Sequence, residues 1–175
     1  GLEQQVAEID AAAVELARRV VMASFKDVLI AGDVGPLGVR LAPFGRVQPE
    51  QARQVFAEQI AALIEAGVDL LVIETMTDLY EIREAIAAAR QINPNIPVVA
   101  SMTFTRDDRT LLGDDPIKVA RGIQEAGADV IGVNCSGGPS QILRILKQMH
   151  LALPEARCSV MQNAGWPEQV GGGIM

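Results

Sequence analysis

The stretch EAGADVIGVNCSGGP, residues 125–139, indicates how the whole chain is built. A glycine follows a helical pattern, a short apolar run from Val130 to Val133 is typical of a buried strand, and Pro139 opens another helix. EAGVDLLVIETM repeats this pattern 60 residues earlier, beginning at Glu65 where the other copy begins at Glu125. One more strand lies between the copies, so each unit takes about thirty residues, the size of a parallel strand with its crossover helix.

The rest of the chain continues this alternation in both directions. It predicts an opening helix with one inward apolar face, made of Leu2, Val6, Ile9, Ala13, Leu16 and Val20. Strands are predicted near residues 28–31, 70–73, 97–103, 130–133 and 159–161, with helices between them from Pro49, Asp78, Asp115 and Pro139. The order is a helix, four strand–helix units and a final strand.

This α/β repetition favours the (β/α)8 TIM barrel, with only its central part, about five strands, present in the chain. A five-stranded flavodoxin-like sheet also fits the strand count. A whole barrel takes about 250 residues, and at least about 200. Residues 1–175 are therefore expected to form a partial barrel domain that lacks the first strands and the last strand, with open sheet edges that a second copy could cover in a homo-oligomer.

The composition argues against several classes of protein. Of the 175 residues 49% are hydrophobic but only 3% are aromatic, so the core must be aliphatic. A net charge of -7 argues against nucleic acid as a partner, and no apolar run approaches the ~20 residues of a membrane span. Two cysteines, Cys135 and Cys158, make no disulfide framework and no signal peptide is recognisable, so a reducing cytoplasm is predicted.

Polar side chains follow the predicted strands at their carboxyl ends, which meet at one rim of a parallel barrel. These side chains are Asp33, Glu74, Ser101, Thr103, Asn134, Cys135, Gln162 and Asn163. A thiol at this rim is a candidate nucleophile or metal ligand, although Cys135 also fits a small buried residue that only packs. Glu74 is placed to hold a cationic group such as a substrate ammonium, or to form an ion pair at the rim. Gly137 and Gly138, just before a helix, could cradle an anion.

Five stretches together resemble the homocysteine S-methyltransferase family, zinc-dependent barrels that methylate homocysteine to methionine. They are AGDVGPLG from Ala31, LLVIETM from Leu70, VVASMTF from Val98, GVNCSGGP from Gly132 and QNAGWPEQVGG from Gln162. Residues 32–45, GDVGPLGVRLAPFG, are most similar to the branch in which this domain is fused to a methylenetetrahydrofolate reductase domain. The amino-terminal domain of cobalamin-dependent methionine synthase is a near neighbour.

The resemblance implies roles for individual residues. Cys135 would be a zinc thiolate and the central residue of catalysis, because zinc activates the homocysteine thiol as a thiolate nucleophile that attacks a methyl donor. Glu74 would hold the homocysteine amino group, and backbone amides near Ser136 and Gly137 would take its carboxylate. Asn163 is a candidate neutral ligand or pocket donor. Further pocket positions at the same rim are Ser101, Thr103 and Asn134.

The resemblance also leaves questions open. The family's other two zinc thiolates form an adjacent Cys-Cys pair on the last strand, and no such pair occurs in these 175 residues. The segment alone is therefore expected to bind zinc poorly and to be inactive. The methyl donor, with methylfolate or cobalamin among the candidates, is not specified. The alternative is a non-catalytic truncated barrel or self-associating module, whereas an aldolase-like barrel is disfavoured because no lysine ends a strand.

Overall fold

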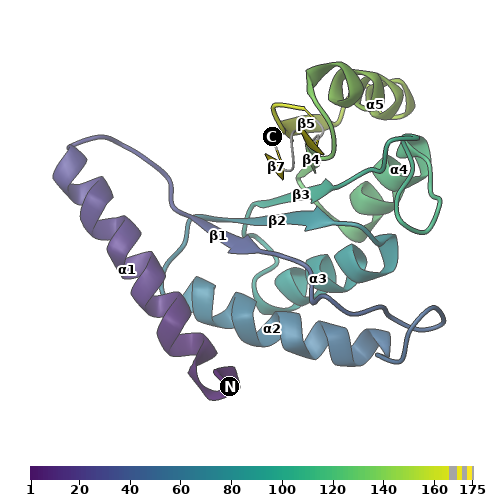
Figure 1. The fold of residues 1–175 in the computed structure, drawn as a ribbon. Helices are drawn as coiled ribbons and strands as arrows, with labels where there is room; N and C mark the ends of the chain where they lie inside the picture. Colours follow the sequence, from purple (N-terminus) through teal and green to yellow (C-terminus); the bar gives the residue numbers. More distant parts are fainter. Residues whose placement is uncertain (166–168, 171–172, 175) are drawn as a thin grey trace.

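The computed structural model describes residues 1–165, 169–170 and 173–174, and its centre is a parallel sheet of five strands (Figure 1). The strands are β1 (Ala31–Val34), β2 (Leu70–Met76), β3 (Val98–Met102), β4 (Val130–Cys135) and β5 (Arg157–Gln162). Each strand pairs with the next in the chain, in the order β1-β2-β3-β4-β5. A flavodoxin-like sheet has the strand order 2-1-3-4-5, with the second strand on the outer side of the first. The consecutive order found here therefore confirms the barrel-type winding over that alternative.

One helix precedes β1 and one follows each of the strands β1 to β4, and the helices after the strands cover the same face of the sheet. The helices are α1 (Val6–Ser24, after the short η1, Glu3–Gln5), α2 (Pro49–Glu65), α3 (Leu79–Ile92), α4 (Pro116–Ala126) and α5 (Pro139–Ala152). A short antiparallel pair, β6 (Gln169–Val170) and β7 (Gly173–Ile174), ends the described chain. Within the described residues β1 and β5 have no outer partner in the five-stranded sheet, so the barrel is not closed. Of the stretch from Gln162 that carries part of the resemblance, residues 166–168 and 171–172 lie outside the described residues.

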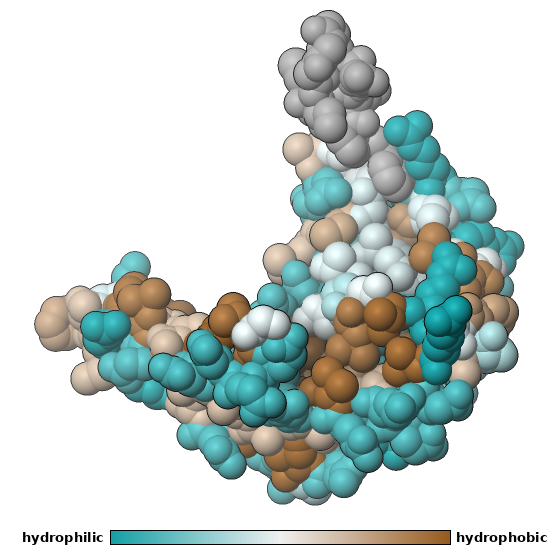
Figure 2. All heavy atoms as spheres, turned by 60° about the horizontal axis from the view of Figure 1, so that its bottom comes forward, coloured by the Kyte–Doolittle hydropathy of each residue, from teal (hydrophilic) through white to brown (hydrophobic). Residues whose placement is uncertain are grey.

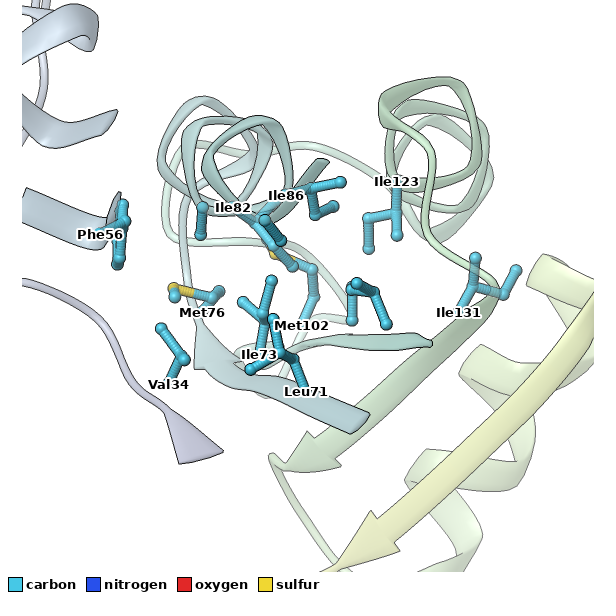
Figure 3. Packing of buried hydrophobic residues seen from close by; sticks show 14 of the residues in the cluster. Val34, Phe56, Leu71, Ile73, Met76, Ile82, Ile86, Met102, Ile123 and Ile131 are labelled. Carbon is cyan, nitrogen blue, oxygen red and sulfur yellow. The ribbon is translucent and has the colours of Figure 1, made fainter. Parts of the chain in front are cut away.

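The hydrophobic core lies between the sheet and the helices, and Figure 3 shows its labelled side chains meeting there. Alternate residues of each strand point into it, such as Leu71 and Ile73 of β2, both fully buried. The intervening residues lie on the opposite face, where Asp33 of β1 is exposed and Glu74 of β2 is only partly buried. No described helix covers that second face, so Asp33 and Glu74 stay accessible.

The repeated Glu-Ala-Gly-x-Asp motif sets where neighbouring strands begin. The carboxylate of Asp69 accepts the N–H of Ile30 at 2.7 Å, and that of Asp129 accepts the N–H of Val98 at 2.8 Å. In both copies the aspartate also donates its own N–H to the carbonyl of the same partner residue. The glycine two positions earlier ends a helix with positive φ, 90° in the first copy and 103° in the second. The motif thus fixes both the helix end and the strand register.

The inward face predicted for α1 is wrong. Val14 is the only buried residue of this helix, whereas Leu16 is 58% and Val20 is 64% exposed. A second stripe, shifted around the helix and including Val14 and Val21, packs against the core instead. Figure 2 shows apolar surface, in brown, on the arm at the left that α1 forms with the segment after it. Helical periodicity identified an apolar stripe but could not decide which of two stripes the neighbouring helix covers.

Two strand boundaries also differ from the predicted ones. The first strand begins at Ala31 rather than Val28, and Val28 and Leu29 are 48% and 68% exposed. The second strand extends to Met76, so Glu74 lies within the strand and not at its end. The predicted cap of α3 is formed by Asp78, which accepts the N–H of Tyr80 at 2.8 Å. None of the described helices is long and apolar enough to cross a membrane.

Two side-chain truncations of similar size should lower the free energy of unfolding by unequal amounts. Ile86→Ala removes a fully buried side chain of the α3 core and should lower the free energy of unfolding by about 2–5 kcal/mol. Leu16→Ala on the exposed stripe of α1 should change it by no more than about 0.5 kcal/mol. Urea titration followed by circular dichroism measures both variants. A Leu16→Ala cost as large as that of Ile86→Ala would contradict the packing of α1 described here.

Candidate active site at the carboxyl ends of the strands

A pair of side-chain hydrogen bonds joins β2 to β4 across the strand between them. Asn134, only 3% exposed, accepts the N–H of Thr75 with Oδ1 at 2.9 Å. Its Nδ2 donates to Oγ1 of the same threonine at 2.8 Å. Both hydrogen-bonding groups of the amide are therefore directed at one residue, which ties together the carboxyl ends of two strands that do not pair with each other.

The backbone around this pair is in an unusual conformation. Thr75, Cys135 and Ser136 have φ values of 60°, 51° and 54°, and they are three of the five non-glycine residues with positive φ in the described chain. For a β-branched residue such as threonine this conformation is rare and costs on the order of 1–3 kcal/mol. The strand pairing is irregular at the same place, between Ile73 and Met76 of β2. Such strain is typical of a functional site.

The thiol of Cys135 lies beside this pair, at the edge of a pocket. Its Sγ is 3.5 Å from Nδ2 of Asn134 and 3.8 Å from Oγ1 of Thr75. The pocket has a volume of about 340 Å³ and is lined by Thr77, Thr103, Phe104, Thr105, Leu111, Cys135, Ser136 and Asn163. The cysteine is partly buried and free. The sulfur is therefore held at the carboxyl edge of the sheet, not in the aliphatic core.

The predicted neighbours Ser136, Thr103 and Asn163 gather around the same loop. The Ser136 hydroxyl donates to the carbonyl of Asn134 at 3.1 Å and accepts the N–H of Phe104 at 2.8 Å. Thr103 Oγ1 donates to that same Asn134 carbonyl at 3.2 Å. Asn163 is exposed and its Nδ2 donates to the carbonyl of Ser136 at 3.1 Å. These side chains hold the loop that carries the thiol, and only Ser136 is nearly inaccessible, at 4%.

Two other predicted residues are buried near this loop without lining the pocket. Gly137 is buried just before α5. Ser101 is 4% exposed and lies against Gly132 of β4, where a Cβ would come within 2.2 Å of the serine Oγ. Only glycine leaves room for the serine at that position. The structure therefore places Ser101 in the packing beneath the site rather than at the pocket surface.

Glu74 does not line the Cys135 pocket but directly precedes Thr75, which contacts the thiol. Burial, and then the negative charge of Asp33 on the neighbouring strand, raise the pKa of the Glu74 carboxyl. The two carboxyl groups form an acidic patch on the uncovered face of the sheet. Such a patch favours a cationic group.

The sequence reasoning missed several residues of this site. Thr75 and Thr77 follow Glu74, and Phe104, Thr105 and Leu111 come from the loop after β3. Proximity to Glu74 was the only signal for Thr75, because nothing in the sequence predicts its positive φ. As for a metal, no group of three or more histidine, cysteine or acidic residues in the described part of the chain could hold one.

Comparisons with known proteins identify the family of this chain. A family model described as homocysteine S-methyltransferase matches residues 1–174. The methionine synthase of Mycobacterium leprae is 29% identical over 144 residues, which are 79% of this chain and 12% of that protein. Betaine–homocysteine S-methyltransferase 1 of Danio rerio is 30% identical over 149 residues, 85% of this chain and 35% of that protein.

A solved structure shares the fold. It is the homocysteine methyltransferase MmuM from Escherichia coli in its metallated form, with a TM-score of 0.76 and 26% sequence identity. The match covers 93% of this chain and 60% of that chain. The five-stranded sheet thus corresponds to part of a larger methyltransferase, and the chain spans less than two thirds of each of these relatives. By its sequence and its fold, the chain belongs to the homocysteine S-methyltransferase family.

Proposed function

We propose that this chain is the central part of a barrel that transfers a methyl group to the sulfur of homocysteine to form methionine, and that Cys135 is its central catalytic residue. The observation that carries the proposal is the strained loop that holds the Cys135 thiol at the carboxyl edge of the sheet, braced by Asn134 and Thr75. A cysteine that only packed in the core would need neither the contacts with Asn134 and Thr75 nor the pocket. The names of the relatives, all homocysteine methyltransferases or methionine synthase, support the same reaction.

Homocysteine presents an ammonium, a carboxylate and a thiol, and the uncovered face of the sheet offers a partner for each. Glu74, with Asp33 beside it, would bind the ammonium. Backbone N–H groups around Ser136 and Gly137, at the amino end of α5, would bind the carboxylate. Asn163 and Thr103 line the pocket next to the thiol and would complete the wall around the substrate. Asn134 would act by holding Cys135, and Ser101 by supporting β4 from below.

Zinc is the metal we propose for this site, with Cys135 as one of its thiolate ligands. Bound zinc would supply the activation of the substrate thiol to a thiolate. The described residues do not form a zinc site by themselves, since no cluster of three ligating side chains occurs among them. The remaining ligands would come from the rest of the barrel, and the 175 residues alone should bind zinc poorly and not turn over. The metallated form of the Escherichia coli relative supports a metal in this family.

The surfaces left open by the fold support a domain that continues beyond these elements. The edges of β1 and β5 lack an outer partner in the described sheet, and the apolar stripe of α1 around Leu16 and Val20 is exposed. We propose that the other strands and helices of a (β/α)8 barrel cover them. The methyl donor would then bind at the same rim, with methylfolate or cobalamin as candidate methyl carriers and a fused reductase domain as one source of the methyl group.

We also propose that the protein works in a reducing cytoplasm, which agrees with its two free cysteines.

The same open surfaces fit a second function, a non-catalytic module that pairs with its own copy. The mass of the natural polypeptide separates the two. A product much longer than the 18.7 kDa of these residues is expected for the enzyme, because it must supply the remaining strands. A natural product of about 18.7 kDa that sediments as a dimer would contradict the enzyme and favour the self-associating module.

Cys135→Ala in the complete barrel tests the metal assignment. Loss of one thiolate should lower zinc affinity by more than the roughly 10–100-fold typical of residues outside the ligand set, and should abolish methyl transfer. Zinc content and methionine formation are measured together, with circular dichroism to verify the fold. Cys158→Ala is the matched control, because that thiol is exposed on β5 and does not line the Cys135 pocket. Full zinc occupancy and turnover in Cys135→Ala would remove this residue from the site.

Glu74→Gln tests the ammonium site. Loss of the charge should weaken homocysteine binding by about 10–100-fold, the range for hydrogen bonds to charged groups, with little effect on kcat.

The same variant should also change how stability depends on pH. Because the raised pKa of Glu74 means that the folded state favours the protonated carboxyl, the ionised carboxylate destabilises the fold at neutral pH. The variant should therefore unfold at higher urea than the wild type at pH 7. This gain should shrink as the pH falls through the raised pKa of Glu74 and vanish below the ordinary pKa of a glutamate.

A matched control is Glu65→Gln, which removes an exposed carboxylate at the end of α2. It should change neither homocysteine affinity nor the pH dependence of stability. An unchanged KM for homocysteine in Glu74→Gln would contradict the proposed ammonium site.

A further inference from the structure

The loop between β3 and α4, residues 103–115, forms much of the wall of the Cys135 pocket. Thr103, Phe104, Thr105 and Leu111 of this loop supply four of the eight residues that line it. Its carboxyl-terminal half is fixed to the residue that follows β2, since the N–H of Leu111 donates to the carbonyl of Thr77 at 3.2 Å. Its first half includes residues 105–109, of which Thr105 lines the pocket.

That first half is held to α5 by a cluster of three side chains, Asp108, Gln141 and Arg144, here called the Asp108 clamp. Arg144 donates to both carboxylate oxygens of Asp108, from Nε at 2.5 Å and Nη2 at 2.8 Å. Gln141 Nε2 donates to Asp108 Oδ1 at 3.0 Å and to the carbonyl of Thr105 at 2.7 Å. Bidentate arginine–carboxylate pairs are among the stronger and more directional hydrogen bonds in proteins.

The burial of the clamp makes it more than a surface ion pair. Gln141 is 7% exposed, and the Asp108 side chain is 15% exposed against 55% for Arg144. Hydrogen bonding from Arg144, opposed by burial and aided by Gln141, lowers the pKa of the Asp108 carboxyl, which is therefore ionised at neutral pH. Because both amide hydrogens of Gln141 face oxygen acceptors, the orientation of its side chain is also determined.

The loop segment has a reason to need such a clamp. Its own bonds form a tight turn, with Thr105 donating its N–H to the carbonyl of Arg109 at 2.8 Å. Asp108 has φ 59°, a conformation that costs free energy for a residue other than glycine. The clamp is what fixes this turn relative to α5, the helix that begins just after the Cys135 loop.

We propose that Asp108, Gln141 and Arg144 are positioning residues of the Cys135 pocket, which lock the wall from the β3–α4 loop to the helix that follows the thiol. Wall and thiol then move as one unit. None of the three touches the thiol; they act through Thr105 and the residues beside it. The inference rests on the proposed function only in taking this pocket as the substrate site, since the clamp itself is defined by its contacts.

Limited trypsin digestion of the chain tests the clamp, because Arg106 and Arg109 lie in the clamped segment. Arg144→Ala should raise the rate of cleavage after these two residues by about tenfold, since cleavage follows the population of the opened loop. Arg144→Lys keeps the charge but loses the bidentate geometry and should give an intermediate rate. Lys147→Ala, three positions further along α5, removes an exposed cation outside the clamp and should not change the rate.

A second measurement separates positioning from simple anchoring. In a Cys158→Ser background, Cys135 is labelled at one fixed pH with a bulky aromatic disulfide and with a small alkyl thiosulfonate. Arg144→Ala should raise the bulky-to-small labelling ratio severalfold, because the wall no longer restricts access to the thiol. Asp108→Asn tests the same point with a residue that tolerates positive φ, should the arginine variant fail to fold.

Unchanged cleavage in both clamp variants would overturn the proposal. So would faster cleavage with an unchanged labelling ratio, because the clamp would then hold the loop without shaping the pocket. Neither assay uses homocysteine or a metal, so the clamp can fail while the methyltransferase proposal stands. In the reverse case, Cys135→Ala would keep full zinc occupancy and turnover, which contradicts the proposed function, while the Arg144 variants still gave the cleavage rates and labelling ratios expected of the clamp.

Discussion

The side chain of Asn134 is the constraint on which the site depends. Its amide oxygen accepts the N–H of Thr75 and its Nδ2 donates to the Thr75 hydroxyl. These two hydrogen bonds fix the ends of β2 and β4 relative to each other, although β3 lies between them. The strained backbone at Thr75, Cys135 and Ser136 is held by this brace and by the bonds of the Ser136 hydroxyl. A thiol in such a loop cannot relax into the core, because its chain is fixed on both sides.

The sheet supplies the platform for this loop. Asp69 and Asp129, the repeated aspartates, start the neighbouring strands in register, so residues at equivalent depth reach one edge together. The helices bury one face in an aliphatic core, and the other face keeps Glu74 and Asp33 accessible. Barrel enzymes likewise carry their catalytic residues on loops at the carboxyl ends of the strands, held in place by a rigid sheet and its helices.

The sequence sufficed for the features that depend on local pattern. The strand–helix alternation and the place of Cys135 after an apolar run followed from residue order alone, and the family followed from five short stretches taken together. Features that depend on packing were not predictable. The stripe of α1 that includes Leu16 was assigned inward because periodicity cannot choose between two stripes, and Thr75 was missed because its conformation is imposed by Asn134 from a distant strand.

We propose that the Cys135 sulfur faces a metal at the carboxyl edge of a closed ring of strands. A crystal structure of the complete barrel grown with zinc, with the metal located by anomalous scattering, tests this most directly. The account predicts a zinc ion about 2.3 Å from Sγ of Cys135, beside the Asn134–Thr75 pair. A zinc ion bound elsewhere, or a Cys135 side chain turned into the aliphatic core, would contradict it.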